Sequence, residues 1–183
     1  MKIIKNLLYK MNQERKIEET DIDLNELLDN ELTFLNANMY YKHEVKKEFS
    51  FSPEIPHLRG VYSDFSQAIL NIIFNALDAM VDSPVKILSV KTDFNPETGR
   101  IVVTISDTGK GIPKEIQEKI FHPFFSTKSE QTTTHGITSG SGLGLSSSVT
   151  LLKNYHGEID FTSEVGAGTT FWIFIPVGCE AKT

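Results

Sequence analysis

A chain of 183 residues can bury one full core, and its 39% apolar and 23% charged residues are typical of a soluble globular protein. Its formal net charge of -6 would repel the phosphates of nucleic acid, so the composition argues against general nucleic-acid binding. The single cysteine, Cys179, excludes a disulfide framework within one chain. No stretch approaches the roughly 20 apolar residues that a membrane span needs. We therefore expect a cytoplasmic domain.

The first part of the chain predicts two helices and a strand. Residues 1–16 have loosely helical spacing and resemble the end of a helix whose packing partner is elsewhere. Asp23 with Glu26 matches a capping box, and a leucine stripe then predicts a helix that reaches about Met39. Alternation over residues 45–51 predicts a half-buried strand.

The stretch 64–80 has the clearest helical pattern in the chain, with Asp64 and Gln67 as a second capping box. Its apolar residues recur three and four apart, as on a helix with one side in a core. On the other side, Asn71, Asn75 and Asp78 fall in one narrow strip. Such a strip is usually a solvated face. Asparagine, however, is a poor helix former that lowers the stability of a helix unless its side-chain amide is used. A ligand-binding strip is the alternative.

The remaining chain predicts strands in adjacent pairs, with helices between them. The expected elements are strands at 85–92 and 100–106, a short helix at 113–121, a loop without regular structure at 126–141, a helix at 143–155, and strands at 158–163 and 169–177. Hairpin pairs favour a mixed sheet over a doubly wound parallel one. We expect an α+β fold, a two-layer sandwich of a mixed β-sheet covered on one face by helices.

Two glycine-rich segments could bind a nucleotide. Asp107 ends a buried strand just before Gly109 and Gly111, and an ionised carboxylate can accept hydrogen bonds from a purine amino group. Taken alone, this segment is better explained as an ordinary strand-to-turn Asp-Gly. Residues 140–145 open a helix, where free amides and the helix dipole favour phosphate. Lys128 could fold over the same phosphates or be a solvated surface lysine.

These segments together resemble the catalytic, ATP-binding domain of bacterial sensor histidine kinases, within the wider GHKL group of ATPases. The resemblance covers about residues 21–177, and five segments in the family's order carry it. Residues 71–76 (NIIFNA) look like the N box, 107–112 (DTGKGI) like the G1 box, 121–128 (FHPFFSTK) like the F box, 140–145 (GSGLGL) like the G2 box, and 166–169 (GAGT) like the following glycine motif. The single glycine after His156 departs from the family's usual pair.

The resemblance implies a role for each matched residue. Asn75 would ligate Mg²⁺, Asn71 would support the metal or the phosphates, and Lys128 would meet the phosphates. Asp107 would accept the adenine amino hydrogen, with Thr169 assisting. The other expected nucleotide contacts are Asp78, Gly109, Gly111, Ile112, Phe124, Ser141, Gly142, Leu143, Gly144 and Leu145. ATP and Mg²⁺ are therefore the expected cofactors.

The implied function is the ATP-binding step of a two-component histidine kinase. Residues 1–20 would be the C-terminal remnant of the dimerisation hairpin, and residues 21–183 the catalytic domain. The phosphoacceptor histidine would lie on that hairpin, outside this chain, and His43 is expected to be an ordinary strand residue. The implied partners are the hairpin domain of a homodimeric parent kinase and a response regulator receiver domain. The resemblance is compatible with a membrane-anchored parent.

Two alternatives stay open from the sequence. Hydrolysing members of the same group place a glutamate base one helical turn before the metal-binding asparagine, and here that position is Asn71, which cannot accept a proton at neutral pH. A nucleotide-switched interaction module without phosphotransfer is the second alternative.

Overall fold

The computed structural model describes residues 18–127, 132–134, 137–139 and 142–178. Its centre is a five-stranded sheet in the order β2-β4-β5-β9-β8. The strands are β2 (Lys46–Phe51), β4 (Ile87–Asn95), β5 (Arg100–Asp107), β8 (Glu158–Glu164) and β9 (Gly168–Pro176). The β2–β4 pair is parallel and the other three pairs are antiparallel, which confirms the predicted mixed sheet.

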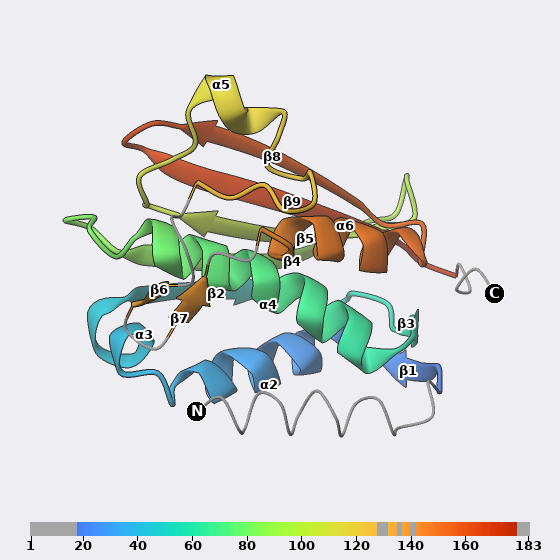
Figure 1. Cartoon of the computed structure of the whole chain (residues 1–183). Coiled ribbons are helices and arrows are strands. Elements are labelled where there is room, and N and C mark those ends of the chain that lie inside the picture. Colours follow the sequence, from blue (N-terminus) through green and yellow to red (C-terminus); the bar gives the residue numbers. More distant parts are fainter. Residues whose placement is uncertain (1–17, 128–131, 135–136, 140–141, 179–183) are drawn as a thin grey trace.

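Helices cover one face of this sheet, as predicted (Figure 1). The described helices are α2 (Leu24–Leu35), α3 (Met39–Glu44), α4 (Tyr62–Ala79), α5 (Lys114–Gln117) and α6 (Gly144–Lys153). Two small antiparallel pairs complete the described elements: β1 (Thr20–Ile22) with β3 (Leu58–Gly60), and β6 (Thr132–Thr134) with β7 (Ile137–Ser139). Across the described residues, no helix is long and apolar enough to cross a membrane.

Helix α4 is the central element of the core because its apolar side is buried between the sheet and the other helices. It contacts α2, α6, β5 and β9. Its buried residues are Phe65, Ala68, Ile69, Ile72, Ile73, Ala76 and Leu77. These side chains share one cluster with Val90 of β4, Val103 of β5 and Ile173 of β9. The helical stripe read from the sequence is therefore the main core contact.

The predicted cap of α2 is confirmed, but the predicted length of that helix is wrong. The Asp23 carboxylate accepts from the amides of Asn25 and Glu26, at 2.9 and 3.1 Å. The helix ends at Leu35 rather than near Met39, because Asn38 caps a separate helix, α3, by accepting from the Tyr41 amide at 3.1 Å. His43, expected in a strand, lies in the last turn of α3.

The capping box expected at the start of α4 is absent, and a tertiary contact replaces it. The helix starts at Tyr62, and its N-cap, Val61, provides no side-chain hydrogen bond. The Tyr155 hydroxyl accepts from the Val61 amide at 3.1 Å and donates to Asp64 Oδ2 at 2.8 Å. The Tyr155 ring also packs on Phe65, with ring centroids 4.5 Å apart. Asp64 therefore binds α6's C-terminal end instead of closing its own first turn.

Two further expectations in the second half are corrected. Residues 132–134 and 137–139 form the β6–β7 hairpin, so the prediction of no regular structure over 126–141 is wrong for them. Threonine-rich polar strands lack the apolar alternation that would have indicated this pair. The helix expected at 113–121 is shorter, because α5 is followed by turns.

Replacing the Tyr155 hydroxyl should destabilise the fold without changing the ring packing. Tyr155→Phe removes the hydrogen bonds to Val61 and Asp64, so we expect the free energy of unfolding to fall by about 1–3 kcal/mol in urea titrations. The control is Tyr62→Phe, because Tyr62 is exposed and its hydroxyl donates to the half-buried Glu31 across a long 3.5 Å. Equal stability of the two variants would contradict the capping role of Tyr155.

Candidate functional site

The predicted site residues come from five segments of the chain, and the structure attaches two of the others to α4. The strip Asn71, Asn75 and Asp78 lies on α4 itself, and all three are half-buried. The loop after β5 is attached to the end of α4, where the Lys110 amide donates to the Ala79 carbonyl at 3.0 Å. The start of α6 is attached to the middle of α4 through Asn71.

Asn71 uses its amide nitrogen within the protein. Nδ2 donates to the Gly144 carbonyl at 3.1 Å and to Ser148 Oγ at 3.3 Å. Gly144 is the first residue of α6, so this bond fixes the N-terminus of α6 against α4. Asn71 therefore keeps a single orientation that two helices define.

Asn75 lies one turn further along α4, and its amide makes no hydrogen bond to any residue in the described part of the chain. A half-buried amide without such a bond is available to a ligand. Within the described ranges, no group of three or more His, Cys, Asp or Glu side chains could hold a metal ion. Among the described residues, the Asn75 amide oxygen is thus a candidate ligand for Mg²⁺, and most oxygen ligands would come from water and phosphate.

Asp107 is a buried carboxylate with a raised pKa. It is 8% exposed, and its Oδ1 accepts from the Gly109 amide at 2.7 Å. Burial raises the pKa of this carboxyl from 3.8 to about 6, although hydrogen bonds from the Gly109 and Thr169 amides act in the opposite direction. A buried carboxylate of this kind gains from a ligand that donates a hydrogen bond to it.

The loop after β5 comes so close to α4 that one of its positions has no room for a side chain. A Cβ on Gly109 would lie 2.7 Å from the Ala79 Cβ. Gly111 packs against the backbone of Glu164, and the Ile112 amide donates to Ser163 Oγ at 2.8 Å. This loop is therefore held on both sides, by the end of α4 and by the end of β8.

Ser163 also holds Thr169, which pairs with Asp107 across β5 and β9. Its hydroxyl lies 2.9 Å from the Thr169 hydroxyl and donates to the Gly168 carbonyl at 3.1 Å. Ser163 was not predicted as a site residue, because a serine in an alternating strand carries no signal of its own.

The start of α6 lies against the segment before the β6–β7 hairpin. Gly142 has a φ of +64°, and a Cβ there would lie 2.5 Å from the Phe124 carbonyl carbon, so a side chain is excluded. Phe124 has a φ of +65° and is 78% exposed. Leu143 is the N-cap of α6, and Leu145 packs against the core. Lys128 and Ser141 lie outside the described residues.

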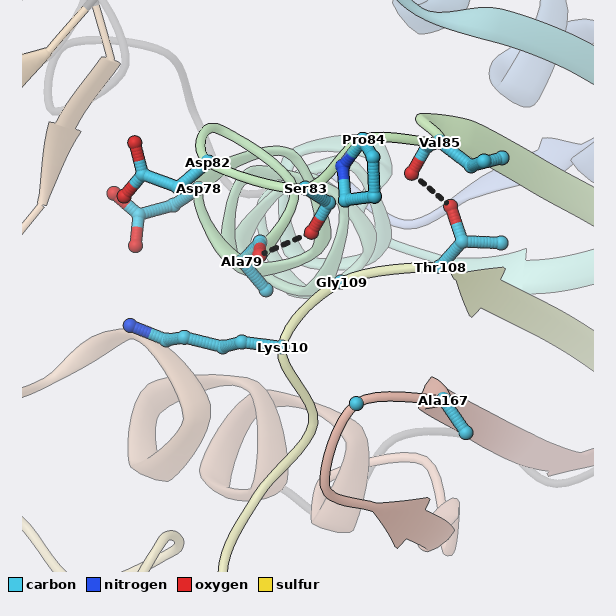
Figure 2. Close-up of a pocket in the computed structure, with 11 residues that line it drawn as sticks. Asp78, Ala79, Asp82, Ser83, Pro84, Val85, Thr108, Gly109, Lys110 and Ala167 are labelled. Atoms are coloured by element: carbon cyan, nitrogen blue, oxygen red, sulfur yellow. Dashed lines mark hydrogen bonds between the residues drawn. The ribbon is translucent and has the colours of Figure 1, made fainter.

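A pocket of about 380 Å³ lies beside the predicted site, at the C-terminal end of α4 (Figure 2). It includes Asp78 and Gly109 from the predicted set. Its other lining residues are Ala79, Asp82, Ser83, Pro84, Val85, Thr108, Lys110, Gly166 and Ala167. Asp107 is not among them, so the pocket borders the predicted adenine-binding residues rather than enclosing them. Thr108 closes one side by donating to the Val85 carbonyl at 2.7 Å.

Comparison with protein families gives a match over most of this region. The model of the family of histidine kinase-, DNA gyrase B- and HSP90-like ATPases matches residues 60–178. Sensor kinase CckA of Brucella abortus is 33% identical over 88% of this chain and 17% of CckA. Sensor histidine kinase ZraS of Escherichia coli is 28% identical over 88% of this chain and 32% of ZraS. This chain thus spans about a third or less of the length of these relatives.

Solved structures share the fold. The catalytic domain of histidine kinase ThkA has a TM-score of 0.69 at 26% identity, covering 87% of this chain and 96% of that domain. Full-length ShkA in complex with AMPPNP has a TM-score of 0.72 at 21% identity, covering 92% of this chain and 33% of ShkA. The fold class and the family resemblance expected from the sequence are both confirmed.

The raised pKa of Asp107 predicts a specific pH dependence of stability. The pKa of Asp107 is about 6 in the folded state and 3.8 ordinarily, so the folded state binds the proton more tightly than the unfolded state. The resulting gain in the free energy of unfolding is fully present below about pH 4 and is lost as the pH rises through about 6. That loss amounts to about 3 kcal/mol. In urea titrations from about pH 4 to 7, Asp107→Asn should therefore gain stability relative to the wild type. Exposed Asp93→Asn is the control, and parallel pH profiles for wild type and Asp107→Asn would contradict this effect.

Proposed function

The chain belongs to the family of histidine kinase-, DNA gyrase B- and HSP90-like ATPases, with a catalytic domain of the sensor-kinase type, and we propose that it presents the γ-phosphate of Mg-ATP to a histidine on a separate dimerisation domain. The observation that carries this proposal is Asn71. It stands one helical turn before Asn75, and its amide nitrogen donates to Gly144. A phosphotransferase needs no water-activating base there, and Asn71 supplies none.

The adenine would lie on the buried end of β5. Asp107 would accept a hydrogen bond from the adenine amino group, and its burial makes that bond worth more than at the surface. Gly109, Gly111 and Ile112 would form the adjacent wall, with the Thr169 hydroxyl near the same edge. Asp78 and Phe124 would border the nucleotide from α4 and from the segment before the β6–β7 hairpin.

The phosphates would lie between α4 and the start of α6. Amides of residues 142–145 and the dipole of α6 favour negative charge there, and Lys128 and Ser141 would add further contacts. Asn75 would hold Mg²⁺, which neutralises phosphate charge during transfer. The Asn75 amide, to which no described residue is hydrogen-bonded, fits an ion that keeps its water and phosphate oxygens. Catalysis by this domain would be positioning and charge neutralisation.

The acceptor would be supplied by another part of a longer kinase. Residues 1–20 would be the end of the dimerisation hairpin, and of these the structure describes only Glu18 to Thr20. The parent would be a homodimer that passes phosphate to a response regulator, with this domain in the cytoplasm. The short share of the relatives' length that this chain spans supports additional domains in the parent.

Phosphotransfer in trans tests this function directly. Given Mg-ATP and a dimerisation hairpin that carries an acceptor histidine, the chain should phosphorylate the hairpin, and acid-labile phosphate should appear on the hairpin alone. Asn75→Ala should reduce transfer at least about a hundredfold, because the metal loses its protein ligand. Asn154→Ala, an exposed asparagine at the end of α6, is the matched control.

Two results would overturn the proposal. One is stoichiometric acid-labile phosphate on the isolated chain, since the acceptor would then lie within it. The other is ATP hydrolysis that survives Asn71→Ala while no phosphate reaches the hairpin, which would indicate a hydrolase.

A further inference from the structure

Ser148 is the most deeply buried polar side chain among the described residues, at 0% exposure. It lies in α6, one turn after Gly144 and opposite the α4 residue Ala68. We propose that Ser148 is a positioning residue that orients the Asn71 amide for the metal of the nucleotide site. This inference rests on the proposed function and specifies the role of Asn71 within it.

The contacts form one closed network between α4 and α6. Ser148 Oγ lies 3.0 Å from the Ala68 carbonyl and 3.1 Å from the Gly144 carbonyl, and its single proton serves these acceptors. The hydroxyl oxygen then accepts from Asn71 Nδ2 at 3.3 Å. The Ser148 hydroxyl proton is therefore used by the two carbonyls, and a lone pair of the hydroxyl oxygen faces Asn71.

This network fixes which end of the Asn71 amide faces the ligand. The oxygen and nitrogen of an asparagine side chain are distinguished by their partners. The Gly144 carbonyl can only accept, so Nδ2 must face it at 3.1 Å, and Ser148 presents a second acceptor to the same nitrogen. The reverse orientation would place Oδ1 against two oxygens. Oδ1 therefore faces neither acceptor, and it lies beside the first turn of α6, where a Cβ on Gly144 would be 3.9 Å from it.

An amide oxygen that faces a ligand favours a cation over an anion. Mg²⁺ and its bound waters need oxygen acceptors, whereas a phosphate oxygen needs a donor, and the Asn71 donor is already used. Of the two roles that the family resemblance allows, Asn71 thus serves the metal or a metal-bound water. Ser148 acts through Asn71, as an outer-shell partner that maintains the orientation of a ligand group.

Removing the hydroxyl should affect this orientation rather than leave unsatisfied groups. The carbonyls of Ala68 and Gly144 lie inside helices, where amides four residues later also bond them. In Ser148→Ala, Asn71 Nδ2 keeps one acceptor instead of two, so its amide becomes less constrained. The fold remains supported by the apolar contacts of α4 and α6.

The test compares nucleotide affinity with and without Mg²⁺. Dissociation constants for a non-hydrolysable ATP analogue are measured by calorimetry in EDTA and in excess Mg²⁺, for the wild type, Ser148→Ala, Ser148→Cys and Ser147→Ala. Ser147 neighbours Ser148 on α6 and is half-buried, which makes it the matched control. Ser148→Cys keeps a weak acceptor of similar size, and it provides the measurement if the alanine variant does not fold.

We expect Ser148→Ala to reduce the enhancement by Mg²⁺ about tenfold, with an EDTA affinity near that of the wild type. The enhancement by Mg²⁺ in Ser148→Cys should lie between those of the wild type and Ser148→Ala, and Ser147→Ala should behave as the wild type. Equal losses with and without Mg²⁺, or no loss at all, would overturn the role of Ser148. A wild type that binds no nucleotide would instead refute the proposed function itself.

Discussion

Burial of the apolar side of α4 is the constraint on which the rest of the structure depends. Seven of its side chains are in the core, from Phe65 to Leu77. Full burial of one large aliphatic side chain is worth about 2 kcal/mol, compared with about 1 kcal/mol for a typical hydrogen bond. The apolar face therefore sets the rotation of α4, and that rotation places Asn71, Asn75 and Asp78 on its polar side, where we propose that the nucleotide binds.

Polar contacts then attach the other site segments to this fixed helix. The Lys110 amide bonds the Ala79 carbonyl, which places the loop after β5 at the end of α4. Asn71 bonds the Gly144 carbonyl, which places the start of α6 near the middle of α4. Tyr155 bonds Asp64, which fixes the other end of α6. Each contact is weak alone, and together they hold the residues proposed to bind adenine and phosphate at defined places along one helix.

The sequence predicted the features that depend on local pattern. The stripe of α4, the Asp23 cap, the strand pairs and the family resemblance all follow from residue type and spacing, and the structure and comparisons confirm them. Contacts between distant residues were not predictable in this way. Tyr155 lies 91 positions from Asp64, so the capping box at Asp64 appeared sufficient from the sequence.

The same limit applies within the site. Ser148 looks like an ordinary helical serine until Ala68 and Gly144 are placed beside it. The break between α2 and α3 was not predicted, because the leucine stripe runs toward Asn38. The Asn38 side chain caps α3, and this local hydrogen bond competes with continuation of α2. The proposed roles of Asn75 and Asp107 rest on the family segments, whereas the proposed orientation of Asn71 rests only on its partners.

The most direct test of the central claim is a crystal structure of this chain with Mg²⁺ and a non-hydrolysable ATP analogue. The account predicts the metal about 2.1 Å from Asn75 Oδ1 and the adenine amino group about 3 Å from the Asp107 carboxylate. Asn71 Nδ2 should remain bonded to Gly144. A nucleotide bound away from the polar strip of α4, or a metal without contact to Asn75, would contradict the claim that one helix organises both the core and the nucleotide site.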